Sequence, residues 1–193
     1  MSENTETNEN DIVPNIVQLK RISMIVGAPN TGKSFYALKL AAAIANGMPF
    51  TSELTQAAPV VFIDFQHWQI ELMERAVDVS GSSSVTLRSC RGENVDNVGL
   101  LKMMTDFANA NGGSTVFIID GFHRAQPKGF SEKNATHWNS LMSGLEEFAV
   151  QTNSAIVLVD PYWGTDCDPE SAPRSICERL AEHFIDVANT HID

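Results

Sequence analysis

The sequence has little of several features that would indicate particular protein classes. It holds only three cysteines in 193 residues and no CxxC pair, which excludes a disulfide framework and a cysteine-ligated zinc site. No apolar run approaches the roughly 18–20 residues that cross a bilayer. The opening residues, 1–4, are polar and acidic and do not resemble a secretory signal. We therefore expect a cytoplasmic protein without a membrane partner.

Basic residues are also scarce, with 13 Lys and Arg against 24 Asp and Glu and a net charge of −11. Residues 1–11 contain four acidic residues and no basic one, and residues 160–193 contain eight acidic residues and two arginines. The stretch between them is close to neutral. This distribution argues against a broad basic surface for nucleic acid. The sequence also lacks a glycine fingerprint for flavin or nicotinamide, a nucleophile elbow and a zinc deaminase signature.

The hydrophobic content, at 43%, is sufficient for one buried core. Residues 1–11 have no apolar periodicity and are predicted to be a disordered acidic tail. Residues 12–193 are predicted to be the single folded domain.

Short runs rich in Val and Ile, without polar alternation, predict strands that are buried on both faces. They cover residues 22–26, 60–65, 116–119 and 155–159, with a weaker run at 85–88. Apolar residues at helical spacing predict helices at 33–45, 70–79, 95–110, 131–152 and 175–188. In the second of these helices the predicted apolar face holds Ile70, Met73, Ala76 and Val77. Strands that alternate with helices indicate an α/β fold, a three-layer sandwich with a mainly parallel sheet.

A complete phosphate-binding motif lies between the first predicted strand and the first predicted helix. Its residues match G-x-x-x-x-G-K-[ST] in full: Gly27, Ala28, Pro29, Asn30, Thr31, Gly32, Lys33 and Ser34, followed by Phe35. The two glycines let the backbone amides wrap around phosphates, and Lys33 supplies a positive charge for the β and γ phosphates. The Ser34 hydroxyl is a ligand for Mg²⁺, and the amino end of the helix favours an anion. The motif predicts a nucleotide site for ATP and Mg²⁺.

A second candidate lies at the end of the predicted strand 116–119, which Asp120 closes. A carboxylate at such a strand end is where P-loop proteins hold magnesium, usually through water. We therefore predict that Asp120 and Ser34 are the magnesium ligands.

With these motifs the chain resembles the RecA-like P-loop ATPases, in particular the RepA-type plasmid helicase group, for which the wider AAA family name is often used. The resemblance covers roughly residues 12–190 and rests on three features besides the phosphate loop. Asp120 is followed by Gly121, the strand at 60–65 follows the first helix, and residues 172–175 are similar to a segment before the last helix of that group. The resemblance implies ATP hydrolysis, assembly with copies of the same chain, a ring among the possible forms, and DNA as a partner.

The chain departs from that group at the position of the catalytic glutamate. Members of the group end this strand with a glutamate that polarises the attacking water, and here Gln66 occupies the matching position. A glutamine orients water by hydrogen bonds but does not accept its proton as a carboxylate does. Asp64 lies two residues before it, and His67 is the other nearby base. The predicted catalytic residues are therefore Lys33, Gln66, Asp64 and Asp120, with the base left open.

A second departure follows the strand at 155–159, where the group carries a His and then a basic residue. No Lys or Arg occurs here before Arg174, and Arg124 is the nearest substitute. Two functions therefore stay open: a magnesium-dependent ATPase that acts on DNA, or a slow or non-hydrolysing module that uses nucleotide to control interactions. A small-molecule kinase fits the length, but no arginine-rich lid follows the phosphate loop.

Overall fold

The computed structural model describes residues 9–28, 30–80, 84–125, 135–161 and 183–186. Its main sheet has six strands: β3 (Ile22–Gly27), β4 (Val60–Asp64), β5 (Thr86–Ser89), β6 (Val116–Asp120), β7 (Ala155–Pro161) and β8 (His183–Asp186). Their order is β5-β4-β6-β7-β3-β8, and every neighbouring pair is parallel. The predicted parallel sheet is confirmed.

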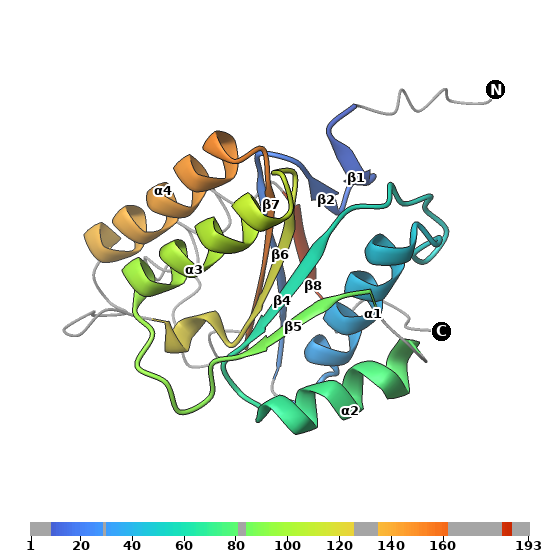
Figure 1. The fold of residues 1–193 in the computed structure, drawn as a ribbon, viewed down its shortest axis with the longest axis horizontal. Helices are drawn as coiled ribbons and strands as arrows, with labels where there is room; N and C mark the ends of the chain where they lie inside the picture. Colours follow the sequence, from blue (N-terminus) through green and yellow to red (C-terminus); the bar gives the residue numbers. More distant parts are fainter. Residues whose placement is uncertain (1–8, 29, 81–83, 126–134, 162–182, 187–193) are drawn as a thin grey trace.

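Helices cover both faces of this sheet. α1 (Lys33–Asn46) and α2 (Gln69–Ser80) lie on one face, and α3 (Asn97–Ala110) and α4 (Ala135–Gln151) lie on the other (Figure 1). A short 3-10 helix, η1 (Phe122–Arg124), follows β6. The three-layer α/β prediction is thus confirmed. Among the described residues, no helix has the length and apolar character needed to cross a membrane.

Two apolar cores, one on each side of the sheet, account for the strand sequences. Ile63 packs in the core that contains Met104 of α3, whereas its neighbour Phe62 packs in the core that contains Leu40 of α1. Successive residues of a strand point to opposite faces, so a strand covered on both sides must be apolar at every position. This is the physical reason for the uninterrupted Val and Ile runs.

The end of α1 follows from its sequence. Gly47 adopts the left-handed conformation at φ 62°, and its N–H donates to the carbonyl of Ile44. The N–H of Met48 donates to Ala43 O at 2.9 Å. Glycine reaches positive φ without steric cost and closes the helix in this way. The predicted stop after the first helix is confirmed.

The structure corrects the sequence-based expectations at both ends of the chain. Asp11, predicted to be the last residue of the tail, begins β1 (Asp11–Val13), which pairs antiparallel with β2 (Val17–Gln18). Its carboxylate accepts a hydrogen bond from Gln18, which ties residue 11 to the folded part. Residues 183–186 form β8 rather than the middle of a helix over 175–188, because they pair with the edge of β3. Residues 162–182 and 187–193 lie outside the described residues.

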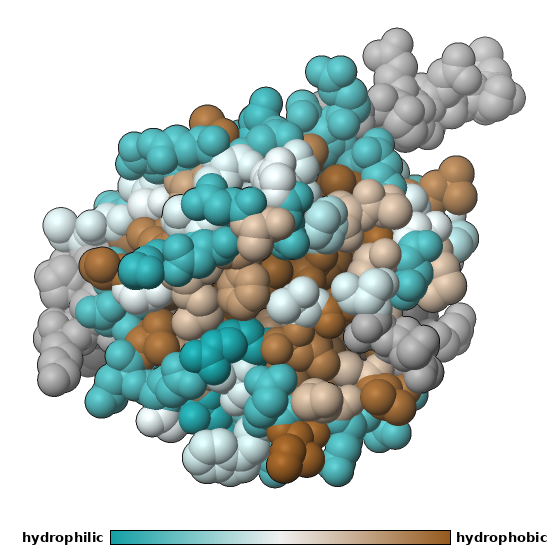
Figure 2. Space-filling view, in the orientation of Figure 1, coloured by the Kyte–Doolittle hydropathy of each residue, from teal (hydrophilic) through white to brown (hydrophobic). Residues whose placement is uncertain are grey.

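The predicted apolar face of α2 is also only partly the buried one. Leu72 and Ala76 are buried, whereas Ile70, Met73 and Val77 are 70%, 52% and 56% exposed. The helix carries two apolar stripes, and packing against the sheet and α1 selects the one through Leu72. Brown side chains gather along the lower edge of the molecule, where α2 lies (Figure 2). We call Ile70, Met73 and Val77 the α2 stripe.

Candidate nucleotide site

The loop between β3 and α1 has the backbone shape that its sequence predicts. Gly32 has φ 88° and Asn30 has φ 63°, both in the left-handed region. A Cβ at Gly27 would lie 2.8 Å from Oγ1 of Thr31, so the tight turn requires glycine there. The Thr31 hydroxyl in turn donates to Ala28 O at 2.9 Å. The loop is thus held in a closed curve by its own side chains.

Lys33 lies across this curve at the first position of α1. Its Nζ donates to Gly27 O at 2.9 Å and to Ala28 O at 2.7 Å. The ammonium group is therefore held over the mouth of the loop, at the positive end of the helix dipole. Ser34 follows it and is half-buried. Pro29, the remaining predicted loop residue, lies outside the described residues.

Two carboxylates meet beside the loop because β4 and β6 are neighbours in register. Asp64 pairs with Asp120 at the carboxyl ends of these strands, and each is 1% exposed. The side-chain amide of Gln66 donates from Nε2 to Oδ1 of Asp120 at 3.0 Å. Gly121, at φ 76°, leaves room for this contact, since a Cβ there would lie 2.9 Å from Cγ of Gln66. The structure thus brings together Gln66 and Asp120, two of the predicted site residues.

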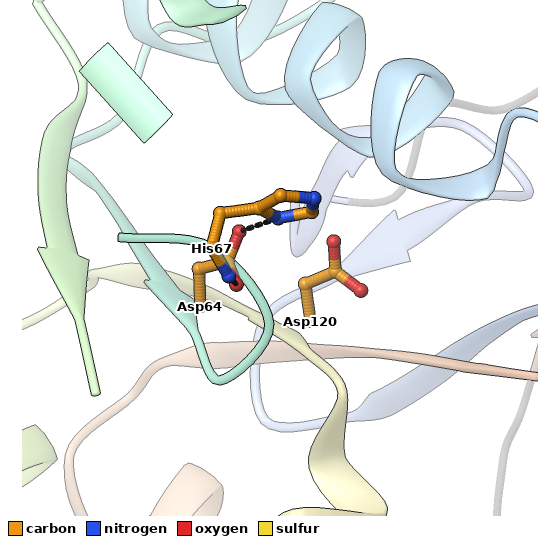
Figure 3. Close-up of side chains that lie close together, drawn as sticks. All are labelled: Asp64, His67 and Asp120. Atoms are coloured by element: carbon orange, nitrogen blue, oxygen red, sulfur yellow. Dashed lines mark hydrogen bonds and ion pairs between the residues drawn. The ribbon is translucent and has the colours of Figure 1, made fainter. Parts of the chain in front are cut away.

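Asp64 organises the turn that follows β4. Its Oδ1 accepts hydrogen bonds from the backbone N–H of Gln66 at 2.5 Å and of His67 at 2.9 Å. Its Oδ2 lies 2.8 Å from Nδ1 of His67, the contact drawn as a dashed line in Figure 3. Three hydrogen bonds at one buried carboxylate fix both the turn and the imidazole ring.

A cleft of about 510 Å³ opens beside these groups, a volume within the range of small-molecule sites. Its walls are formed by loop and α1 residues, by the turn after β4, by α2 and by η1: Asn30, Gly32, Lys33, Ser34, Phe35, Gln66, His67, Arg75, His123 and Arg124. Lys33, Arg75 and Arg124 bring three positive charges to its surface. Such a surface suits a polyanionic ligand.

Sequence reasoning missed Arg75 and His123 as cleft residues. Arg75 belongs to no motif and is exposed on α2, and only the packing of α2 brings it to the cleft. His123 comes two residues after Gly121, in a turn that the sequence did not predict to be a 3-10 helix. Arg124 was considered a substitute for a residue acting on a neighbour, and it lines the cleft of its own chain, with Nη1 3.3 Å from Phe65 O. Arg174 lies outside the described residues.

The donor set near β6 fits a divalent cation. One ligand atom from each of Asp64, His67 and Asp120 lies within 4.8 Å of the others (Figure 3). Mg²⁺ prefers oxygen ligands, and the Asp120 carboxylate and the Ser34 hydroxyl supply them at the two sides of the cleft. The residues present therefore fit the predicted Mg²⁺.

Cys90, next to this site, is not a reactive thiol. Its backbone N–H donates to Asp64 O at 2.7 Å, and its side chain is buried. Burial raises the pKa of the Cys90 thiol to about 11. The thiol is therefore protonated at neutral pH and does not serve as a nucleophile or a metal ligand.

Comparison with solved structures finds the same fold. The chain is similar to a helicase-type ATPase domain solved on its own, with a TM-score of 0.64 at 12% identity, over 87% of this chain and 69% of that one. It is also similar to a DnaB-like replicative helicase, with a TM-score of 0.63 at 11% identity, over 86% of this chain. This chain spans 46% of the length of that helicase.

Comparison of sequences gives one result for the family and none for individual proteins. No curated protein matches the sequence. The family model of the AAA domain matches residues 2–160, a range that includes the phosphate loop, the turn after β4 and Asp120. The chain belongs to the AAA domain family, and it has the fold of a RecA-like P-loop ATPase.

Proposed function

We propose that this protein binds ATP together with Mg²⁺ in the cleft and hydrolyses it. The observation that carries the proposal is the closed loop over residues 27–34, with Lys33 Nζ across its mouth and the buried Asp120 nearby. The loop amides and Lys33 would hold the phosphates, and Ser34 and Asp120 would hold the metal. Mg²⁺ would neutralise charge on the phosphates when it is bound.

The remaining cleft residues have roles that follow from their chemistry. Arg75 and Arg124 are positive charges at the cleft surface, and they balance the negative charge that a triphosphate brings. Phe35, which is 45% exposed, offers an apolar face at the cleft. The family and the similar helicase support DNA as the setting of the activity, and this part of the proposal rests on resemblance.

A nucleotide-controlled interaction module is the competing function. The hydrogen bond from Gln66 to Asp120 favours it, because the position of the expected catalytic glutamate holds an amide. Calorimetric titration with ATP and GTP, followed by phosphate release with and without single-stranded DNA, separates the two. We expect ATP binding with measurable turnover that DNA stimulates. Binding without any turnover would support the module instead, and no binding of either nucleotide would contradict both.

Asp120→Asn tests the magnesium ligand. The asparagine keeps the shape and an oxygen acceptor for Gln66 but removes the negative charge that attracts the cation. We expect ATP affinity measured with EDTA to stay within about threefold of the parent, and the gain in affinity on adding Mg²⁺ to fall by at least about tenfold. An identical magnesium gain in both proteins would show that Asp120 is not a ligand.

The α2 stripe supports the proposal that the chain assembles with copies of itself. Contiguous exposed apolar side chains mark interaction surfaces, and Arg75 of the same helix lines the nucleotide cleft. We expect Met73→Asp to weaken self-association by at least about tenfold, because it places a charge in the middle of the interface. Light scattering across a concentration series with Mg–ATP measures this.

The matched control for this experiment is Val98→Asp. Val98 is 68% exposed and belongs to α3, on the opposite side of the sheet. This variant should assemble as the parent does. A parent that stays monomeric, or equal loss in both variants, would contradict the assignment of the α2 stripe.

A further inference from the structure

We infer that His67 is the base that takes the proton of the attacking water, and that the buried Asp64 sets its tautomer. The inference rests on the proposed function and names the catalytic group that the sequence left open. His67 lines the same cleft as Lys33 and Ser34, and its side chain is 19% exposed. It therefore reaches both the buried carboxylate behind it and the space in which a nucleotide would lie.

The hydrogen bonds at Asp64 determine which ring nitrogen carries the proton. An ionised carboxylate only accepts hydrogen bonds, so the 2.8 Å contact from Oδ2 to Nδ1 of His67 requires the hydrogen on Nδ1. In the neutral ring the Nε2 atom then keeps its lone pair and is an acceptor. Figure 3 shows this second nitrogen on the side of the ring away from Asp64. The ring is thus held in the form that accepts a proton.

The other two predicted groups are poorer bases. Asp64 already accepts three hydrogen bonds and is 1% exposed, so water does not reach it as it reaches the cleft. Gln66 directs its side-chain amide to Oδ1 of Asp120, and an amide does not accept a proton near neutral pH. His67 is the one of these three groups that combines a place in the cleft wall with an atom that accepts a proton.

The step balances without any further reactant. The water oxygen forms a bond to the γ-phosphorus, and the bond from that phosphorus to the bridging oxygen breaks, so ADP leaves with its electron pair. The water proton goes to Nε2 of His67, and the negative Asp64 stabilises the resulting imidazolium. The proton then passes to phosphate or to solvent, which restores the starting ring.

Asp64→Asn separates this arrangement from a purely structural role. The asparagine Oδ1 still accepts from the backbone N–H groups of Gln66 and His67, and this fixes the side-chain orientation. Its Nδ2 then donates to Nδ1 of His67, which forces the ring hydrogen onto Nε2 and removes the acceptor. The turn is kept and the tautomer is reversed.

Ring ¹⁵N chemical shifts of the protein without nucleotide test the tautomer directly. We expect a protonated Nδ1 at His67 in the parent and a protonated Nε2 in Asp64→Asn. The control is Asp106→Asn, the same chemical change at a side chain that is 67% exposed on α3, which should leave the His67 signals and the activity unchanged. A parent ring protonated on Nε2 would overturn the inference.

Turnover and affinity measured on the same proteins complete the test. We expect His67→Gln and His67→Ala to lower kcat by about 10²–10⁴-fold, with the affinity for a non-hydrolysable ATP analogue changed less than about threefold. Asp64→Asn should lower kcat by at least about tenfold. Added imidazole should restore part of the rate of His67→Ala in proportion to its concentration, an effect that a structural role would not produce.

Each remaining outcome decides between the inference and the function beneath it. An unchanged kcat in His67→Gln overturns the inference, and so does a loss that a higher Mg²⁺ concentration restores, because His67 would then act as a metal ligand. A parent that binds ATP but never turns it over overturns the inference and leaves nucleotide binding in place. A parent that binds no nucleotide contradicts the proposed function itself.

Discussion

Lys33→Ala should weaken Mg–ATP binding by at least about a hundredfold, to the point of loss in an ordinary titration. In the structure Nζ of Lys33 lies 2.9 Å and 2.7 Å from two carbonyl oxygens of its own loop. A phosphate entering the loop offers a charged acceptor in their place, and charge-assisted hydrogen bonds are roughly twice as strong as neutral ones. Without the ammonium group, only loop amides and the helix dipole remain to hold the phosphates. Isothermal titration calorimetry gives the affinity.

The fold should survive this change, because Lys33 faces the loop whereas α1 is anchored by buried residues such as Leu40 and Ile44. Thermal unfolding within a few degrees of the parent checks this point. Lys102→Ala is the matched control, since Lys102 is 77% exposed on α3 and away from the cleft. The assignment of the phosphate loop is wrong if a folded Lys33→Ala protein binds Mg–ATP as tightly as the Lys102→Ala control.

Phe117→Ala should lower the free energy of unfolding by about 3–5 kcal/mol, the usual cost of removing a buried phenyl ring. Phe117 is fully buried in β6, and its ring meets that of Phe148 from α4 edge to face at 5.6 Å. Its loss leaves a cavity between the sheet and the helix and removes the aromatic pair. Urea unfolding followed by circular dichroism measures the change.

The exposed Leu54, at 78%, supplies the control, and Leu54→Ala should change the free energy by less than about 0.5 kcal/mol. Phe117→Leu should lie between the two, because it keeps most of the buried volume. A cost below about 1 kcal/mol for Phe117→Ala would mean that β6 and α4 are not packed as the structure shows.

The features that the sequence predicted are those written in short local segments. A strand covered on both faces must be apolar at every position, and so Phe62 and Ile63 mark β4 without knowledge of its neighbours. The loop at 27–34 is equally local, since its glycines and Lys33 serve one turn and one helix start. Gly47 determines the end of α1 for the same reason. Each of these features needs no distant partner.

The features that were missed depend on residues far away in the chain. Residues 183–186 have apolar positions compatible with a helix, and only pairing with the edge of β3 makes them a strand. The buried stripe of α2 is selected by its packing, since both of its stripes are apolar. Arg75 reaches the cleft because of that same packing.

The arrangement at Asp64 shows the same limit inside the site. The sequence predicts that Asp64 and His67 lie near the nucleotide, but it offers no reason to pair them. Their contact arises because the turn after β4 folds both backbone N–H groups onto one oxygen and leaves the other oxygen for the ring. Hydrogen bonds of a single turn thus determine which candidate base is usable, and residue spacing alone does not reveal them.

The central claim is that a nucleotide binds in the loop at 27–34, close to Asp120. A crystal structure of the protein with Mg²⁺ and a non-hydrolysable ATP analogue tests it most directly. We expect the phosphates inside the loop, Lys33 Nζ moved from the carbonyls of Gly27 and Ala28 to phosphate oxygens, and the metal between Ser34 and Asp120. An analogue bound elsewhere, or a loop left empty at saturating analogue with Lys33 still on its own carbonyls, would contradict the account.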